Sequence, residues 1–175
     1  FGYKQIGVYM NQEDFNSAPK MSNSHVGDVK YADMDDNKTI NANDRTIIGN
    51  NIPDFIWGLS NQLTYKNFDF SFLIQGVQGN EILHLGKRFY TQLEGNQQQM
   101  KIVLNRWQSE QNPGDGWTPR ANSQTTGQNN AISSRWIEDG SFARLNNVTL
   151  GYTLSKKLAN QLYFQNLRIY LSAQN

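Results

Sequence analysis

The residues from Asp33 to Asp44 have the spacing in this sequence that most clearly indicates a chemical role, the binding of a cation. Side-chain oxygens stand at positions 1, 3, 5, 9 and 12 of this stretch, and the residue at position 7 offers its main-chain carbonyl. A hard cation needs several oxygens from one short loop, and this spacing is typical of EF-hand-type Ca²⁺ loops. We therefore expect the loop to hold a structural Ca²⁺ ion. The candidate ligands are Asp33, Asp35, Asn37, Thr39, Asn41 and Asp44.

Two residues depart from the Ca²⁺-loop pattern. Lys38 stands at position 6, where a Gly normally allows the sharp turn, and Asp44 stands at position 12 in place of a longer, bidentate Glu. A Lys among carboxylates also neutralises part of their charge. The alternative interpretation is an Asp- and Asn-rich turn that holds no metal.

Other residues give little indication of catalysis. Glu138 and Asp139 are adjacent, so on a strand they would point to opposite faces and could not act as an acid–base pair. His25 and His84 have no nucleophile or carboxylate pair at a recognisable spacing, and the chain has no Cys. We therefore expect that this chain is not an enzyme.

Composition narrows the class of protein further. The net charge is +1 and the charged residues are 18% of the chain, with no basic block, so we expect no nucleic-acid partner. Hydrophobic residues reach only 37%, yet aromatic residues reach 12%. No run approaches the roughly 20 apolar residues of a membrane-spanning helix. This composition fits thin strands with one apolar face, joined by long polar loops.

Apolar and polar residues alternate in the segments 57–66, 68–77, 142–154 and 167–174, which is the period of a β-strand. Only Lys66 and Asn67 separate the first two segments, a spacing that predicts a tight hairpin. Residues 1–10 look like a further strand. The fold class is therefore predicted to be all-β with antiparallel strands.

The connections between these strands differ greatly in length. The connection from Gly79 to Ser134 is long, and it contains one short helix predicted by the spacing of Met100, Val103, Leu104 and Trp107. The polar stretch from Arg120 to Asn130 is expected to be an exposed loop. Short turns on one side and long loops on the other are typical of outer-membrane barrels. Alternation alone fits a soluble β-sandwich equally well.

Several motifs along the chain then point to one family. The segment 134–152 begins Ser-Arg-Trp-Ile-Glu-Asp-Gly-Ser-Phe and closely resembles a signature of the SusC/RagA family of TonB-dependent transporters of the Bacteroidetes outer membrane. Further matches follow in the expected order over essentially the whole chain. They are the segments 1–4, 27–31, 44–49, 65–69, 75–76, 105–107 and 167–175.

This resemblance implies much about fold and function. Family members have an N-terminal plug and a 22-stranded transmembrane β-barrel, and they import oligosaccharides or peptides with a SusD-like surface lipoprotein, driven by TonB. Residues 1–175 would then be the C-terminal part of such a barrel in the bacterial outer membrane, in contact with lipid and without the plug or the final strands. A glycan or a peptide would be the ligand.

The resemblance also implies which connections would lie on each side of the membrane, and one alternative hypothesis remains. The turn at Lys66–Asn67 and the connection from Ser155 to Gln165 would face the periplasm, whereas the acidic loop and the 79–134 connection would be extracellular. The rival hypothesis is a soluble β-rich module that binds carbohydrate with the help of Ca²⁺.

Overall fold

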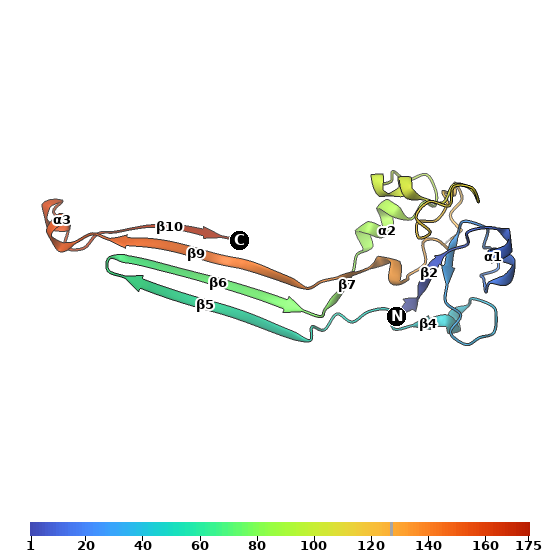
Figure 1. Ribbon diagram of the computed structural model, residues 1–175, viewed down its shortest axis with the longest axis horizontal. Coiled ribbons are helices and arrows are strands. Elements are labelled where there is room, and N and C mark those ends of the chain that lie inside the picture. Colours follow the sequence, from blue (N-terminus) through green and yellow to red (C-terminus); the bar gives the residue numbers. More distant parts are fainter. Residues whose placement is uncertain (127) are drawn as a thin grey trace. The chain divides into compact units, whose positions relative to one another are not determined.

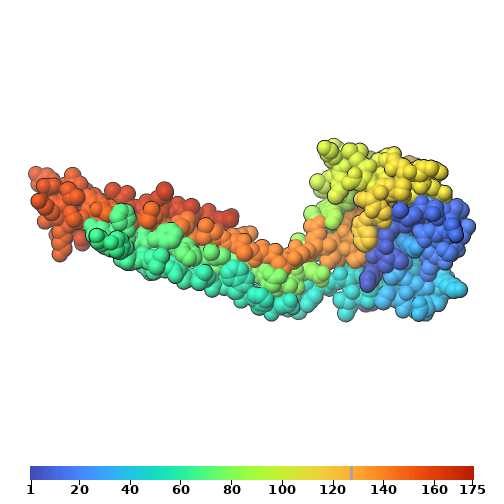
Figure 2. Space-filling view, in the orientation of Figure 1, coloured from blue at the N-terminus to red at the C-terminus, as the bar shows by residue number. Residues whose placement is uncertain are grey.

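The computed structural model describes residues 1–126 and 128–175, which form two compact units. Unit 1 comprises Phe1–Asn51 and Glu81–Glu138, and unit 2 comprises Ile52–Asn80 and Asp139–Asn175. In Figure 2 the blue and yellow segments pack together in unit 1, and the green and orange-red segments pack together in unit 2. Each unit therefore joins segments that are far apart in the sequence.

Unit 2 is one antiparallel sheet whose strands lie in the order β10-β9-β6-β5 (Figure 1). The strands are β5 (Phe55–Tyr65), β6 (Phe68–Gln78), β9 (Phe142–Thr153) and β10 (Arg168–Gln174). The antiparallel all-β prediction and the long strands read from the alternating segments are confirmed. The short helix α3 (Lys156–Gln161), between β9 and β10, was not predicted.

The register brings the apolar side chains of the four strands onto one face. Phe70 pairs with Leu63 on β5 and with Leu150 on β9, and Leu150 in turn pairs with Leu171 on β10. The β6–β9 register shifts between Leu73 and Ile74. A one-residue slip reverses the faces of a strand, so this bulge places Leu145 opposite Ile74, among the apolar side chains.

The predicted tight turn joins β5 to β6. Tyr65 pairs directly with Phe68, and Lys66 adopts a positive φ of 53°. That left-handed conformation is uncommon outside Gly and is tolerated here in the turn itself. The carbonyl of Asn67 accepts a hydrogen bond of 2.8 Å from the main-chain nitrogen of Thr153 on β9.

Unit 1 is built from short elements. Its two-stranded ladders are β1–β4, β2–β3 and β7–β8. The strands are β1 (Gly2–Tyr3), β2 (Gln5–Val8), β3 (Val29–Tyr31), β4 (Arg45–Thr46), β7 (Glu81–Leu83) and β8 (Ile137–Asp139). The helices are α1 (Gln12–Ser17), α2 (Leu85–Thr91) and the 3₁₀ helices η1 (Ala42–Asp44), η2 (Lys101–Asn105) and η3 (Ser134–Trp136). The strand expected in residues 1–10 is present as β1 and β2.

The core of unit 1 joins its two chain segments. Tyr3, Val29, Tyr31 and Ile40 form a buried cluster, and Trp136 is fully buried. The Val29 main-chain nitrogen donates to Asn129 Oδ1 at 2.8 Å. The connection from 81 to 138 is therefore part of a packed body.

Two sequence predictions about this connection are wrong. In place of the helix predicted from Met100 to Trp107, the structure has only the short 3₁₀ helix η2. Met100 and Leu104 are more than half exposed, so their helical spacing does not correspond to a buried helix face. In the stretch expected to be an exposed loop, Gln128 and Asn129 are buried because they bond to the core. Gly127 of that stretch lies outside the described residues. No helix among the described residues has the length and apolar character needed to cross a membrane.

Candidate functional site

The acidic loop lies between β3 and η1. Its Asp33, Asp35 and Asp44 bring carboxylate oxygens within 4.8 Å of one another. Asp44 is fully buried at the end of η1, where its carboxylate accepts from the main-chain nitrogens of Met34 and Asn41 at 2.8 and 2.7 Å. One end of the cluster is thus fixed by the fold.

Hydrogen bonds also shape the other end of the loop. The main-chain nitrogens of Lys38 and Asn37 donate to the Asp33 carboxylate at 2.7 and 3.3 Å. Desolvation raises the pKa of Asp33, but these hydrogen bonds outweigh it and hold that pKa below its ordinary value. Asp33 is therefore an anion at neutral pH.

The remaining candidate ligands are engaged within the loop. Asn37 Oδ1 accepts from the Thr39 nitrogen, the Thr39 carbonyl accepts from Asn41 Nδ2, and Asn41 Oδ1 accepts from the Asn43 nitrogen as the cap of η1. Lys38, at the position where Ca²⁺ loops carry Gly, has a φ of 64°. The backbone thus makes the left-handed turn of such a loop with a residue for which it is strained.

Two of the residues discounted for catalysis, Glu138 and His84, form a surface ion-pair cluster with Lys87. Glu138 lies 3.1 Å from His84 Nδ1 and 2.9 Å from Lys87 Nζ. Hydrogen bonding to Lys87 is the chief cause that lowers the Glu138 pKa. Asp139 instead accepts from the Ser141 nitrogen at 2.8 Å. The two carboxylates therefore bind separate partners. The contacts of Glu138 with His84 and Lys87 link β8 to α2.

The sheet of unit 2 exposes its apolar face. Ten large apolar side chains on this face are at least 38% exposed, and they run across all four strands. They are Phe55, Trp57, Leu59, Leu63, Tyr65, Phe68, Leu145, Leu150, Ile169 and Leu171. An apolar surface of this extent marks a contact with a membrane or another protein. We call it the apolar face below.

The opposite face carries polar side chains and an ion pair. Arg168 on β10 binds Asp69 on β6 through two nitrogens, at 3.0 and 2.5 Å. The pair crosses β9 above Gly151, where an added Cβ would lie 2.5 Å from both partners. A side chain at position 151 would therefore collide with the ion pair that joins β10 to β6 across β9. The two faces of the sheet therefore differ in polarity.

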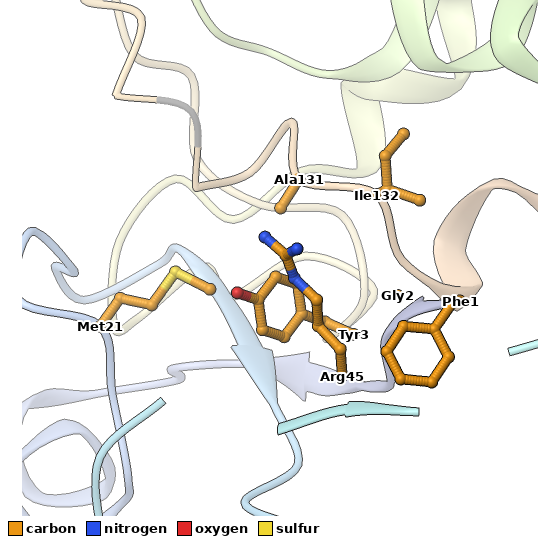
Figure 3. A pocket seen from close by; sticks show the side chains of 7 residues that line it. All are labelled: Phe1, Gly2, Tyr3, Met21, Arg45, Ala131 and Ile132. Carbon is orange, nitrogen blue, oxygen red and sulfur yellow. The ribbon is translucent and has the colours of Figure 1, made fainter. Parts of the chain in front are cut away.

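A pocket of about 420 Å³ lies in unit 1 beside β1 and β4 (Figure 3). Arg45 pairs directly with Tyr3 across the β1–β4 ladder, and its guanidinium lies 5.3 Å from the centre of the Tyr3 ring. Figure 3 shows Met21 and Phe1 on either side of this pair. No sequence pattern indicates this pocket, because only the strand pairing brings its residues together.

Known proteins match the chain over nearly its full length. The TonB-dependent receptor P26 of Formosa agariphila is 33% identical over 174 residues, which are 99% of this chain and 17% of that protein. The TonB-dependent receptor SusC of Bacteroides thetaiotaomicron is 25% identical over 175 residues, 99% of this chain and 16% of SusC. The chain thus spans about a sixth of these relatives. No protein-family model matches it.

Solved structures share the fold. The RagAB peptide transporter superposes with a TM-score of 0.75 at 20% identity, over 99% of this chain and 18% of the matched chain. Its "closed-closed" state gives a TM-score of 0.70. The resemblance predicted from the sequence motifs is confirmed: this chain belongs to the SusC/RagA family of TonB-dependent receptors.

Proposed function

We propose that this chain is part of an outer-membrane TonB-dependent transporter that imports oligosaccharides or oligopeptides together with a SusD-like lipoprotein. The observation that carries the proposal is the apolar face, which is exposed on all four strands of unit 2. Strands of about eleven residues have the length that a tilted strand needs to cross a bilayer. The relatives named above support the same function.

The two edges of the sheet fit this role. β5 and β10 each pair with one neighbour only among the described residues, so the outer hydrogen-bonding edge of each strand is available to a further strand. Within a membrane every main-chain polar group needs a partner, and a closed barrel meets that need. We propose that further strands of the same barrel pair with these edges.

Fractionation and uptake test the proposal in a cell that produces the full-length protein. We expect the protein to stay in the outer-membrane fraction after a urea wash, and uptake of oligosaccharide or oligopeptide to stop when TonB is deleted. Deleting the cognate lipoprotein should reduce uptake without removing the protein from the membrane. Recovery of the protein as a monodisperse, detergent-free species would instead support the rival soluble module.

We also propose that the acidic loop binds a structural Ca²⁺ ion. The supporting observation is the convergence of three carboxylates, one of them fixed by burial. Carboxylates are the oxygen ligands that Ca²⁺ prefers, and Asp33, Asp35 and Asp44 would hold the ion. Its role would be to brace the loop between β3 and β4.

Calorimetry of the full-length protein in detergent tests this site. We expect Ca²⁺ to bind with a Kd of about 10⁻⁴–10⁻³ M, the range of extracellular Ca²⁺ modules. Asp35→Asn should weaken binding because it removes a charged ligand, and Lys38→Gly should strengthen it by removing a positive charge and a strained φ. Asp36→Asn, in the same loop but outside the cluster, is the matched control. Absence of saturable binding at millimolar Ca²⁺ would contradict the site.

A further inference from the structure

We propose that the pocket beside β1 and β4 binds a carboxylate that is attached to an apolar group. The pocket is about 420 Å³, which lies within the range of small-molecule sites. The pocket lies in unit 1, and binding there does not depend on the transport function proposed for the sheet of unit 2.

The pocket carries a positive charge from Arg45. Arg45 is the only charged residue among the lining residues Phe1, Gly2, Tyr3, Met21, Arg45, Ala131 and Ile132. Of the ion pairs formed within residues 1–126 and 128–175, none involves Arg45. The neighbouring Asp44 is occupied by two main-chain nitrogens. The guanidinium group therefore has free donors for an anion.

The guanidinium of Arg45 is held in position by its neighbours on β1. Arg45 is held opposite Tyr3 by the β1–β4 register, and its charge lies over the Tyr3 ring at 5.3 Å. Tyr3 is itself fixed, because it is 8% exposed and its ring centre is 5.2 Å from that of Tyr31. A guanidinium that is already ordered loses less side-chain entropy when it binds a ligand. Its planar fork also matches a carboxylate.

The rest of the pocket lining is mainly apolar. Phe1, Met21, Ala131 and Ile132 offer apolar surface, and Tyr3 and Arg45 are the only lining residues with polar side-chain atoms. A sugar needs many hydrogen-bonding partners for its hydroxyl groups, and this lining has few. An apolar or aromatic group that carries one carboxylate matches both the walls and the charge.

Two lining segments of the pocket, β1 and residues 131–132, are in direct main-chain contact. The Tyr3 nitrogen donates to the Ile132 carbonyl at 3.0 Å, and a Cβ added at Gly2 would lie 2.6 Å from the same oxygen. β1 therefore lies directly against the 131–132 segment, and both sides of the pocket are set by the fold of unit 1. Figure 3 shows Ala131 and Ile132 across the pocket from Tyr3 and Arg45.

A matched pair of probes tests the proposal in the full-length protein in detergent. The probes are N-acetyl-phenylalanine and N-acetyl-phenylalaninamide, which differ only in the carboxylate. We expect calorimetry to show about tenfold or tighter binding of the acid, since a hydrogen bond to a charged group contributes enough for that ratio. Arg45→Gln should abolish the preference, and Arg45→Lys should keep part of it because the charge remains.

The control is Arg106→Gln, the same substitution elsewhere in unit 1, which should leave both affinities unchanged. Heat-dependent gel mobility of each variant checks that it is folded. Equal affinity for the acid and the amide, or a preference that survives Arg45→Gln, would overturn the proposal. Tighter binding of methyl glucuronide than of N-acetyl-phenylalanine would also overturn it, in favour of an acidic sugar.

Discussion

Replacing Leu59 with Arg is expected to destabilise the protein in a lipid bilayer by about 2–4 kcal/mol, the cost of an Arg on the lipid face of a barrel near the midplane. Leu59 lies on the apolar face near the middle of β5 and is half exposed, so the substitution removes little internal packing. The measurement is urea titration of the full-length protein refolded into vesicles, followed by heat-dependent gel mobility.

The next residue supplies a matched control. Ser60 is exposed like Leu59 but points to the opposite face of β5, so Ser60→Arg should change the unfolding free energy by less than about 1 kcal/mol. Equal effects at the two positions would contradict a lipid-facing apolar face. A larger effect at Ser60 would mean that the two faces are assigned the wrong way round.

A second large effect is expected when Asp28 is replaced with Ala. The Asp28 side chain is 2% exposed, and its carboxylate accepts from Arg120 Nε at 2.8 Å, Asn129 Nδ2 at 3.0 Å and the His25 nitrogen at 2.9 Å. Removing one partner of a buried ion pair costs about 3–5 kcal/mol because the other charge is left uncompensated. Amide hydrogen exchange in the 26–31 segment should report the loss as faster exchange.

A double-mutant cycle isolates the ion pair within this effect. Arg120→Gln combined with Asp28→Ala should cost less than the sum of the two single changes, with a coupling of about 0.5–3 kcal/mol. Glu13→Ala, an exposed acid in α1, is the control and should stay within about 0.5 kcal/mol. Strict additivity of the two changes would show that Asp28 stabilises unit 1 through its amide and main-chain partners alone.

The strands of unit 2 could be predicted from the sequence because their signal is local. Alternation in the segments 57–66 and 68–77 gave both strands, and the two residues between them gave the turn. The bulge beside Ile74 could not be predicted, since it depends on which residue of β9 lies opposite. Leu145 reaches the apolar face only through that pairing.

Unit 1 was much less predictable, because its structure comes from contacts between distant segments. The composition of the 120–130 stretch indicates a solvated loop, yet Asn129 is buried by its bonds to Asp28 and Val29. Three of the residues predicted from the spacing of the acidic loop, Asp33, Asp35 and Asp44, bring carboxylate oxygens within 4.8 Å of one another, and Ca²⁺ binding there stays a prediction. The pocket of Arg45 and Tyr3 had no local pattern at all, since its chemistry arises from a cross-strand pair.

The hairpin of β5 and β6 interrupts unit 1 in the sequence, and this has a consequence for the order of folding. The bonds from Val29 to Asn129 and from Tyr31 to Gln128 span about a hundred residues and enclose the whole hairpin. Such non-local contacts form slowly, because the intervening chain must first lose its freedom. The β5–β6 pairing is local and can form early. Unit 1 would then close last, once the hairpin has shortened the effective loop between its two halves.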